Sequence, residues 1–501
     1  MTTIAGHIAN VVAIGGDVAA IDFDGATLSW KALGDGTRAL SALLEQAGIG
    51  ADGRIGLLGR NRLEQVGSFV AILGSGRALL LVNALRPAPL IAEEVSELTL
   101  PCLIGSRADL SPPVMESARA QGTMVVAVEA AHGALTFEVL SEIGSGPFAP
   151  RTPGTLIEIQ TSGTTGKPKR IPVAEHTVAS SLADGVRTAK GAVDRIELAP
   201  KASPTLMFGP LVHTSGTFNT LMSVFEVRPI VLFEKFDAEK YRQALVKYRP
   251  KFAALPPASI KMMVDSNATK EDFSSVLAAR AGTAPLPVEL QIAFEEKFGV
   301  PVLTTYGATE FMGVATSWTL EDHKRFGVAK RGSVGRPSKG VKLRVVDPAS
   351  GEEVPVGEQG ILQARIDRID GGKEWIRTTD LARLDEDGFL YITGRADDAI
   401  IRGGFKVMAG KVSDVLLQCP GVYEAIVLGR ADERLGEVPV AVVEPYPGET
   451  VDEATLKAFA RERLVPYEVP ARFHVVEKLP RTVSDKVSRV EVKKMLDELE
   501  G

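Results

Sequence analysis

The chain has 501 residues, which exceeds the roughly 250 to 300 residues at which one hydrophobic core stops growing, so at least two domains are expected. Hydrophobic residues make up 45% and charged residues 24% of the chain, which excludes a fibrous or disordered protein. A formal net charge of −6 argues against a nucleic-acid-binding surface, although a local basic pocket for phosphates stays compatible with it.

The cysteines and the apolar runs indicate a cellular compartment. Cys102 and Cys419 are far apart in the chain and lack metal-ligand spacing, which argues against a disulfide scaffold and a zinc site. No apolar run approaches the roughly 18 residues of a membrane span, and the first residues lack the basic segment of a secretory signal. We therefore expect a cytoplasmic protein with no membrane span and no nucleic-acid partner.

The N-terminal part of the chain alternates between strand-like and helix-like segments. Residues 54–61 predict a strand, residues 63–76 an amphipathic helix, and residues 77–84 a second buried strand, which together form a βαβ unit. Similar alternation recurs in residues 204–212, 228–248, 251–258 and 290–307. Parallel sheets covered by helices, and thus an α/β fold, are expected.

The pattern changes from about residue 333. Short alternating strands separated by Gly, Pro and Asp turns predict a small β-rich subdomain. Beyond it, about 100 residues predict a compact α+β region. We therefore place a boundary near Asp397, between a large N-terminal domain of residues 1–396 and a C-terminal domain of residues 397–501.

A segment rich in glycine, hydroxyl groups and lysine, TSGTTGKPK, occupies residues 161–169. Its glycines let backbone N–H groups turn toward an anion, its hydroxyls donate further hydrogen bonds, and Lys169 adds a positive charge. A Walker A loop is excluded because it would need Gly at Thr161 and a hydroxyl at Pro168. The predicted phosphate-binding residues are Thr161, Ser162, Gly163, Thr164, Thr165 and Gly166.

This segment resembles the phosphate loop of the adenylate-forming superfamily, which contains acyl-CoA synthetases, stand-alone adenylation domains and firefly-type luciferases. AGTAPL at residues 281–286 resembles the segment that lies along the adenine, and YGATE at residues 306–310 resembles the motif Tyr-Gly-x-Thr-Glu. The resemblance implies that Tyr306 packs on the base, Thr309 meets the α-phosphate and Glu310 helps to hold Mg²⁺, which favours oxygen ligands. The nucleotide-binding residues implied are Gly282, Thr283, Ala284, Pro285, Tyr306, Gly307, Asp380 and Arg395, of which Asp380 accepts from the ribose hydroxyls.

LPRTVSDKVSR at residues 479–489 resembles the C-terminal loop whose lysine enters the site during adenylation. Lys486 at that position makes physical sense, since attack of a carboxylate on the α-phosphorus brings two anions together and a point charge stabilises them. The implied catalytic residues are Lys486, Glu310, Thr309 and Lys169, with Glu310 as metal ligand.

The acyl pocket is implied by segments that are mostly apolar with small residues, which suit aromatic, medium-chain or polycyclic acids equally. Its implied residues are Phe208, His213, Gly216, Ala281, Thr305, Gly307 and Gly313. Taken singly, Tyr306 fits a core position, Asp380 a turn and His213 a structural role. With the stretch from Thr379-Asp380 to Gly394-Arg395, which resembles a further motif of the family, five motifs follow the family's order along the chain, and this order favours the functional interpretation.

The resemblance implies two half-reactions: a carboxylic acid and ATP give acyl-AMP and pyrophosphate, and a thiol such as CoA then displaces AMP. A mobile C-terminal domain swings between them, with Asp397 at the hinge. The residues implied to line the CoA tunnel are Gly403, Gly404, Phe405 and Lys406. ATP or AMP, Mg²⁺ and CoA are thus expected as substrates or ligands, and the acid and its adenylate as partners.

Three residues depart from the family pattern: Arg170 stands where a glycine usually follows the phosphate loop, Lys411 replaces a glutamate, and Asp485 replaces the glycine before Lys486. These changes bear mainly on adenylation. The main hypothesis is a complete acid:CoA ligase. The alternatives are an enzyme that only thioesterifies an adenylate made by a separate adenylating enzyme, an adenylation enzyme that loads a carrier protein, a luciferase-like oxygenase, and a non-catalytic nucleotide-binding sensor.

Overall fold

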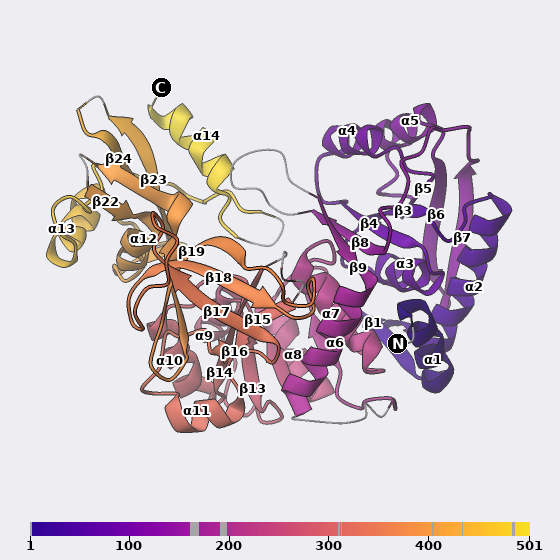
Figure 1. Ribbon diagram of the computed structural model, residues 1–501, viewed down its shortest axis with the longest axis horizontal. Helices are drawn as coiled ribbons and strands as arrows, with labels where there is room; N and C mark the ends of the chain where they lie inside the picture. The colour runs from indigo at the N-terminus through magenta and orange to yellow at the C-terminus, as the bar shows by residue number, and fades with distance from the viewer. Residues whose placement is uncertain are drawn as a thin grey trace. The chain divides into compact units, whose positions relative to one another are not determined.

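The computed structural model describes residues 3–160, 170–190, 198–308, 311, 313–402, 405–432, 434–482 and 486–500. Figure 1 shows its helices and strands. The chain forms two compact units: Met1–Ala315 with Thr319–Arg325, and Thr316–Trp318 with Phe326–Gly501. Asp397 lies within the second unit, and the domain boundary placed there stays a prediction.

A seven-stranded sheet in the order β7-β6-β5-β3-β4-β8-β9 forms much of the first unit. Strands β3, β4, β5, β6 and β8 pair in parallel, and the outer strands β7 and β9 are antiparallel. The predicted βαβ unit is confirmed as β3, α3 (Leu63–Gly74) and β4. The strands are β3 (Arg54–Gly59), β4 (Ala78–Asn83), β5 (Cys102–Gly105), β6 (Met124–Ala131), β7 (Ala134–Ser141), β8 (Thr155–Gln160) and β9 (Arg170–Ala174).

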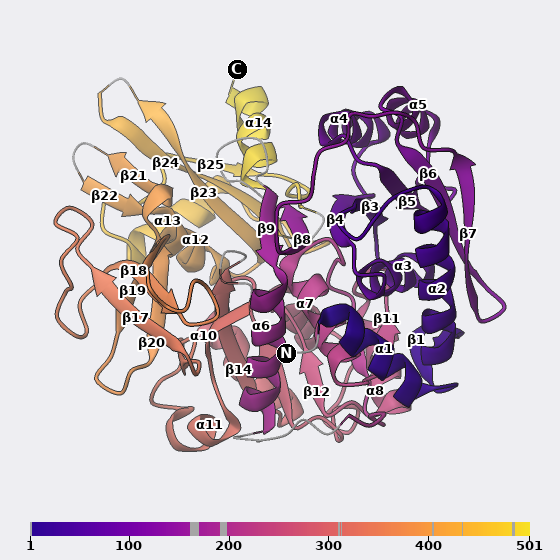
Figure 2. The ribbon, with the colours of Figure 1, turned by 45° about the vertical axis from the view of Figure 1, so that its right-hand side comes forward.

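Helices cover both faces of this sheet. Alternate residues of a strand point to opposite faces, so Leu79 and Leu81 join the core beneath α1, α2 and α3, whereas Leu80 and Val82 pack toward α4 and α5. Figures 1 and 2 show α4 and α5 side by side. The bounds are α1 (Ile4–Gly15), α2 (Trp30–Gln46), α4 (Ala88–Leu98) and α5 (Pro112–Ala120).

A second sheet of the first unit has the order β10-β11-β1-β2. Its strand β1 pairs in parallel with β11, which lies about 200 residues later in the chain, and Ile21 is the register partner of Ile230. The elements here are β1 (Ala19–Phe23), β2 (Ala26–Ser29), α6 (Glu175–Lys190), β10 (Thr205–Met207), α7 (Thr214–Phe225), β11 (Ile230–Leu232) and α8 (Ala238–Tyr248).

A third sheet carries the strands β12, β13, β14 and β15 in that order. Strands β12, β13 and β14 are parallel, and a cluster of aromatic rings packs beneath them, with the rings of Phe273 and Phe298 4.3 Å apart. The elements are β12 (Phe252–Ala254), α9 (Pro257–Asp265), β13 (Ala278–Ala281), α10 (Val288–Phe298), β14 (Val302–Ala308), β15 (Gly313–Ser317) and α11 (Leu320–Phe326).

The second unit contains the predicted β-rich subdomain, an antiparallel sheet in the order β17-β18-β19-β20, and a C-terminal sheet in the order β22-β21-β24-β23 with β25 beside β24. The first of these regions has β16 (Arg336–Pro337), β17 (Val341–Val346), β18 (Gly360–Ile366), β19 (Ile376–Leu384) and β20 (Leu390–Arg395). The second has η2 (Ala396–Asp398), β21 (Ala399–Arg402), β22 (Phe405–Met408), α12 (Ala409–Leu417), β23 (Val422–Asp432), β24 (Gly436–Pro445), α13 (Glu453–Arg463), β25 (Arg472–Val475) and α14 (Arg489–Glu500).

The predicted fold class is confirmed: parallel βαβ subdomains, a β-rich subdomain and a C-terminal α+β region occur in the expected order. Within the described residues, no helix combines the length and the apolar character needed to cross a membrane.

Candidate active site

A buried asparagine holds the segment predicted to border the acyl group. Asn61 follows β3 and is only 3% exposed. Its amide nitrogen donates to the carbonyl oxygens of Phe208 at 2.9 Å, Gly209 at 3.1 Å and Phe233 at 3.2 Å. Its amide oxygen accepts from the backbone N–H of Leu211 at 2.9 Å. One side chain thus ties the carboxyl end of β3 to the carboxyl ends of β10 and β11, the edge where ligands bind in open α/β sheets.

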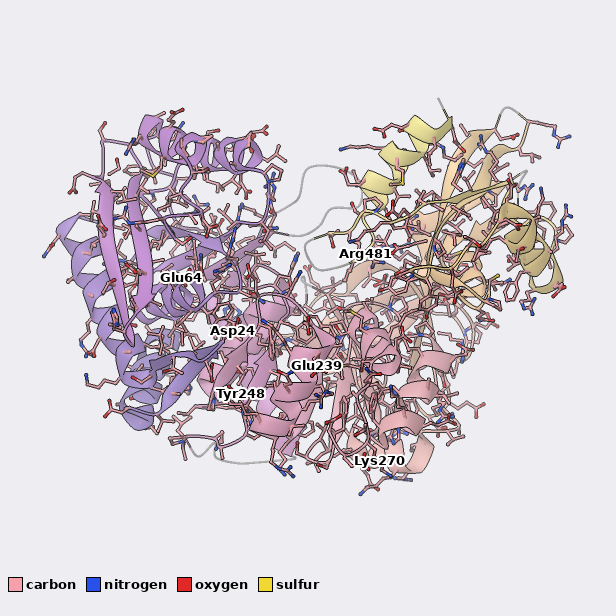
Figure 3. The ribbon with its side chains drawn as sticks, turned by 180° about the vertical axis from the view of Figure 1, so that it is seen from behind. Asp24, Glu64, Glu239, Tyr248, Lys270 and Arg481 are labelled. Atoms are coloured by element: carbon pink, nitrogen blue, oxygen red, sulfur yellow. The ribbon has the colours of Figure 1, made fainter. Side chains whose placement is uncertain are left out.

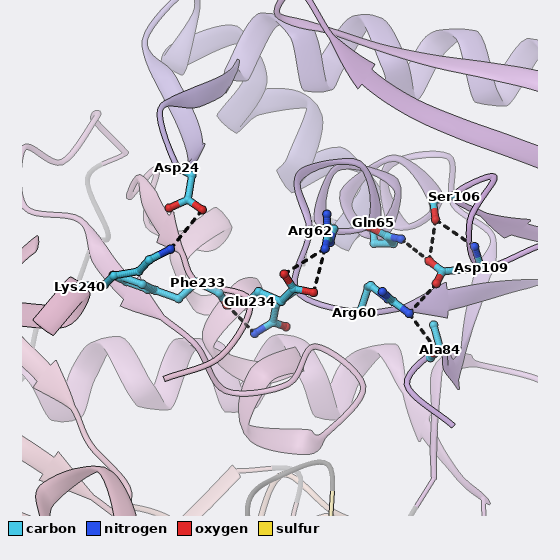
Figure 4. A network of polar contacts seen from close by, with 11 residues as sticks. Asp24, Arg60, Arg62, Gln65, Ala84, Ser106, Asp109, Phe233, Glu234 and Lys240 are labelled. Carbon is cyan, nitrogen blue, oxygen red and sulfur yellow. Dashed lines mark hydrogen bonds and ion pairs between the residues drawn. The ribbon is translucent and has the colours of Figure 1, made fainter. Parts of the chain in front are cut away.

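Charged side chains form pairs in this region, as Figure 4 shows for Arg60 with Asp109 and Arg62 with Glu234. Asp109 is buried and pairs with Arg60 at 2.7 Å, while Gln65 and Ser106 donate to it at 2.8 and 2.7 Å. The neighbouring Arg62 makes a bidentate contact with Glu234 at 2.9 and 3.0 Å. These pairs hold the ends of several strands together.

The predicted acyl-pocket residues of this region lie on one short stretch of chain. The ring of Phe208 packs against Phe236 at 4.7 Å, and half-buried His213 directly precedes α7. A Cβ added to Gly216, in the first turn of α7, would lie 2.0 Å from the carbonyl oxygen of Pro210. Only glycine fits at this close approach of helix and loop.

The adenine-like segment and the following motif meet at the ends of β13 and β14. Ala281 is the register partner of Thr304, and the hydroxyl of Thr305 donates to the carbonyl oxygen of Ala281 at 3.2 Å. A Cβ at Gly282 would lie 2.6 Å from that hydroxyl. Thr283 has a φ of +70°, which is uncommon for a residue with a side chain and concentrates at functional sites. Thr283, Ala284 and Pro285 are exposed at this edge.

The next turn of the chain brings Gly307 and Gly313 together. A Cβ at Gly307 would lie 2.5 Å from the carbonyl oxygen of Gly313, so β14 and β15 approach closely. The rings of Tyr306 and Phe311 lie 6.2 Å apart, edge to face. Thr309 and Glu310 lie outside the described residues, and their predicted roles stay predictions.

The predicted phosphate loop, residues 161–169, also lies outside the described residues, but the strands on either side of it are described. Gln160 ends β8 and Arg170 begins β9, and the two are register partners in an antiparallel pair. The guanidinium of Arg170 forms an ion pair with Glu94 and donates to the carbonyl oxygen of Leu81 at 3.0 Å. Burial lowers the pKa of Arg170.

In the second unit, the structure brings together the first and last parts of one motif that was predicted to bind the nucleotide. Asp380 of β19 is the register partner of Arg395 of β20. The guanidinium of Arg395 donates to the hydroxyl of Thr379 at 2.5 Å, and the backbone N–H of Asp380 donates to the hydroxyl oxygen of Thr378 at 3.1 Å. The side chains of Asp380 and Arg395 are half-buried.

Lys486 is exposed and closes a short loop. The backbone N–H of Thr482 donates to the carbonyl oxygen of Lys486 at 2.6 Å, and an antiparallel bridge joins Arg481 to Val487. Arg481, labelled in Figure 3, donates to Glu444 at 3.4 Å. The base of this lysine loop is therefore fixed to β24. Asp485, one of the departures, lies outside the described residues.

The remaining predicted residues lie around η2 and β22. Asp397 lies in η2, and Phe405 begins β22, where its exposed ring stacks on Tyr467 at 4.7 Å. Gly403 and Gly404 and the side chain of Lys406 lie outside the described residues. Lys411, which departs from the family pattern, pairs with Glu468: its ammonium group contacts both carboxylate oxygens at 2.7 Å.

Two further observations concern ligands. Among the described residues, no group of three or more His, Cys, Asp and Glu side chains could hold a metal ion, and Glu310 lies outside them. A cavity of about 410 Å³ beside the paired strands β1 and β11 is lined by Asp22 and Tyr248, among others, but by none of the predicted site residues. The Tyr248 hydroxyl, on the residue labelled in Figure 3, donates to Asp22 at 2.7 Å.

Sequence reasoning did not single out Asn61 or Glu94. A polar residue at the end of the predicted strand of residues 54–61 was the available signal for Asn61. Glu94 carried no signal, because its importance depends on contacts with residues far away in the chain.

Known protein families match most of the length of this chain. The family model of the AMP-binding enzymes matches residues 9–367, and that of the AMP-binding enzyme C-terminal domain matches residues 411–486. The indoleacetate–CoA ligase of Aromatoleum aromaticum is 28% identical over 95% of this chain and 95% of its own length. The 2-succinylbenzoate–CoA ligase of Geobacillus kaustophilus is 33% identical over 68% of this chain and 69% of its own length.

Among solved structures, ATP-bound MatB of Rhodopseudomonas palustris superimposes with a TM-score of 0.82 at 22% identity, over 99% of this chain and 100% of that one. This likeness agrees with the fold described above. From the family models and the relatives together, the chain belongs to the AMP-binding enzyme family, within the adenylate-forming superfamily, and is of the AMP-forming acyl-CoA synthetase type.

Proposed function

We propose that this chain is a complete acid:CoA ligase that carries out both half-reactions. ATP, Mg²⁺ and CoA are the substrates or ligands of this enzyme type. The observation that carries the proposal is the meeting of two nucleotide motifs at the ends of β13 and β14, where Thr305 hydrogen-bonds to Ala281. Exposed backbone and hydroxyl groups at the carboxyl edge of parallel strands suit a nucleotide.

In the first half-reaction, a carboxylate oxygen of the acid forms a bond to the α-phosphorus of ATP, and the bond to pyrophosphate breaks. Mg²⁺ supplies positive charge to the phosphates when bound, with Glu310 as the proposed protein ligand. Lys486 stabilises the negative charge that develops between the reacting anions. Asp380 accepts hydrogen bonds from the ribose hydroxyls, and Arg395, its strand partner, lies beside the same nucleotide.

In the second half-reaction, the sulfur of CoA attacks the carbonyl carbon of the acyl-adenylate. The carbon–oxygen bond to AMP breaks, AMP leaves with the bonding electrons, and the thiol proton passes to solvent. The loop of residues 402–406 lines the path of the thiol in this proposal, with Asp397 as the hinge about which the C-terminal domain turns.

The substrate acid carries an apolar acyl group, because the predicted acyl pocket is mostly apolar and contains small residues. Phe208 and Gly216 border this pocket, and Asn61 fixes the backbone between them. Two relatives are named for acids with an aromatic ring, indoleacetate and 2-succinylbenzoate. Aromatic acids are therefore the first class to test, followed by medium-chain and polycyclic acids.

The deciding experiment measures the two half-reactions separately in purified protein. Pyrophosphate release is followed with ATP, Mg²⁺ and each acid of the panel, and AMP release is followed with synthetic acyl-adenylates and CoA. We expect both activities with the same preferred acid. We also expect Lys486→Ala to lose pyrophosphate release by about 100-fold or more while keeping most of the second activity.

The alternatives give different results in this experiment. Release of AMP without release of pyrophosphate would favour an enzyme that only thioesterifies an adenylate made by a separate adenylating enzyme. Pyrophosphate release with no transfer to CoA, but with loading of a phosphopantetheinyl protein, would favour a carrier-protein partner. Binding of ATP with neither activity across the panel would favour a nucleotide-binding sensor. Light from an acyl-adenylate and oxygen would favour a luciferase-like oxygenase.

A further inference from the structure

The two residues that border the predicted phosphate loop contact the same carboxylate. Gln160 directly precedes the loop and Arg170 directly follows it, and they are register partners in the β8–β9 pair. The amide nitrogen of Gln160 donates to Oε1 of Glu94 at 3.4 Å, and the guanidinium of Arg170 pairs with the same oxygen. Glu94 belongs to α4, which lies outside the loop and more than 60 residues away from it in the chain.

Glu94 is itself held on its other side. It is 8% exposed, and its second oxygen pairs with the guanidinium of Arg86. Arg170 also donates to the carbonyl oxygen of Leu81 in β4, the strand next to β8. Both partners of the Glu94–Arg170 pair are therefore fixed by further contacts, so the pair cannot shift without breaking several hydrogen bonds.

The described ion pairs beside the loop leave a positive surplus. Among them, two buried carboxylates, Glu94 and Glu158, face three guanidinium groups, those of Arg54, Arg86 and Arg170, which leaves one positive charge beyond neutrality. Such a surplus beside the predicted phosphate loop favours an anion. The Glu94–Arg170 pair is itself neutral, so its own contribution is to position the base of the loop.

We propose that Glu94 and Arg170 form a positioning pair that fixes both ends of the phosphate loop for the ATP-dependent half-reaction. This inference rests on the proposed function, because it concerns the first of its two steps. Loop hydrogen bonds to phosphate require placement within a fraction of an ångström, which a buried and doubly held ion pair supplies. In this proposal Arg170 supports adenylation, although relatives usually have a glycine at this position.

The test compares Glu94→Gln, Arg170→Gln and the double variant with the parent protein. We expect each single variant to raise KM for ATP in pyrophosphate release by about 10-fold or more, because the hydrogen bonds to a charged partner are lost. The double variant should lose little more than either single variant, since the two residues act as one pair. AMP release from a synthetic acyl-adenylate and CoA should change at least 10-fold less than pyrophosphate release.

Two further variants separate positioning from general folding. Arg170→Lys keeps the charge but not the forked donors, and should recover part of the affinity for ATP. Arg77→Gln is the matched control, because Arg77 is a buried arginine of the same unit, 3% exposed, that donates to the carbonyl oxygen of Ile49 at 2.8 Å, apart from this pair. Thermal unfolding of each variant shows how much stability is lost.

The outcomes are distinct. Equal losses in both half-reactions, matching those of Arg77→Gln at equal loss of stability, would overturn the proposal in favour of a purely structural pair. Faster pyrophosphate release in Arg170→Gly would overturn it by showing that Arg170 obstructs the site. If the parent protein showed neither half-reaction, the proposed function would fail, and calorimetric binding of Mg²⁺-ATP to the same variants would still test the pair through the change in affinity.

Discussion

Asp380 and Arg395 lie directly opposite each other in the antiparallel pair of β19 and β20. They stand 15 positions apart in the chain, and the sheet brings them to one place. Sequence reasoning assigned both of them to the nucleotide as parts of one extended motif. Because the strand register places both residues together, both can contact one nucleotide, and substitution of Asp380 tests this assignment.

Asp380→Ala should raise KM for ATP in pyrophosphate release by roughly 10- to 100-fold, because a charged acceptor of the ribose hydroxyls is removed. Asp380→Asn should fall between the parent protein and Asp380→Ala, since the amide oxygen still accepts but carries no charge. Initial rates at varied ATP and saturating acid measure the effect.

The control for this prediction is Asp370→Asn. Asp370 lies in an exposed turn with a φ of +48°, which asparagine tolerates, and accepts from the backbone N–H groups of Lys373 and Glu374. Its substitution should leave KM for ATP within about twofold of the parent value. A KM for Asp380→Ala equal to that of the control would contradict the assignment.

Asn61→Ala should destabilise the protein and weaken binding of the acid. It leaves the carbonyl oxygens of Phe208, Gly209 and Phe233 and the N–H of Leu211 without this partner, so the free energy of unfolding should fall by about 3 kcal/mol. KM for the acid should rise more than KM for ATP, because the affected backbone borders the acyl pocket. Urea unfolding and two KM measurements test this.

Asn83→Ala is the matched control, since the Asn83 side chain accepts a single hydrogen bond, from the backbone N–H of Leu85 at 2.9 Å. It should reduce the free energy of unfolding by about 1 kcal/mol and leave KM for the acid nearly unchanged. If both asparagine variants shifted KM for the acid equally, Asn61 would have no special role in the pocket.

Gly216→Ala should lower kcat/KM for the acid by about 10-fold or more. The new Cβ would lie 2.0 Å from the carbonyl oxygen of Pro210 and must displace either α7 or the loop before it. Gly209→Ala in the same loop is the control, because the nearest atom to its Cβ, the Ser215 hydroxyl, is 3.9 Å away. Comparable loss in both variants would show that the loop tolerates no substitution at all, and the steric argument at Gly216 would be wrong.

Much of the fold was predictable because local patterns carry it. The βαβ unit of β3, α3 and β4 follows from periodicity, and so do the alternating strands β17, β18 and β20. The pairing of β1 with β11 was not predictable, since about 200 residues separate them and a sequence pattern contains no register.

The candidate site divides in the same way. Contiguous motifs predicted Ala281, Tyr306 and Lys486, because glycine, hydroxyl and charged residues occur there in a characteristic order. Sequence reasoning did not predict Glu94 or Asn61, because each contacts residues more than 60 positions away in the chain. Arg170 was recognised as a departure, but its partner Glu94 could be found only in three dimensions.

The last prediction concerns Glu295 and pH. Burial alone would raise the pKa of Glu295, but hydrogen bonds from His323 at 3.0 Å, the backbone N–H of Val302 at 3.0 Å and Gln291 at 3.2 Å bring it below its ordinary value of 4.5. A carboxyl group with a lowered pKa in the folded state contributes stability above its unfolded pKa and loses it as the pH falls through its folded pKa. The contribution should therefore decline as the pH falls below about 4.5.

Glu295→Gln isolates this contribution, because the amide keeps the shape of the side chain but does not ionise in this range. The midpoint of thermal unfolding of the parent protein should exceed that of the variant by a few degrees at pH 7, and the difference should shrink toward pH 4. Glu116→Gln, on the exposed face of α5, is the control and should leave the midpoint nearly unchanged at both pH values. A difference that grew toward acid pH would contradict the sign of the argument, because it would mean that protonated Glu295 stabilises the fold.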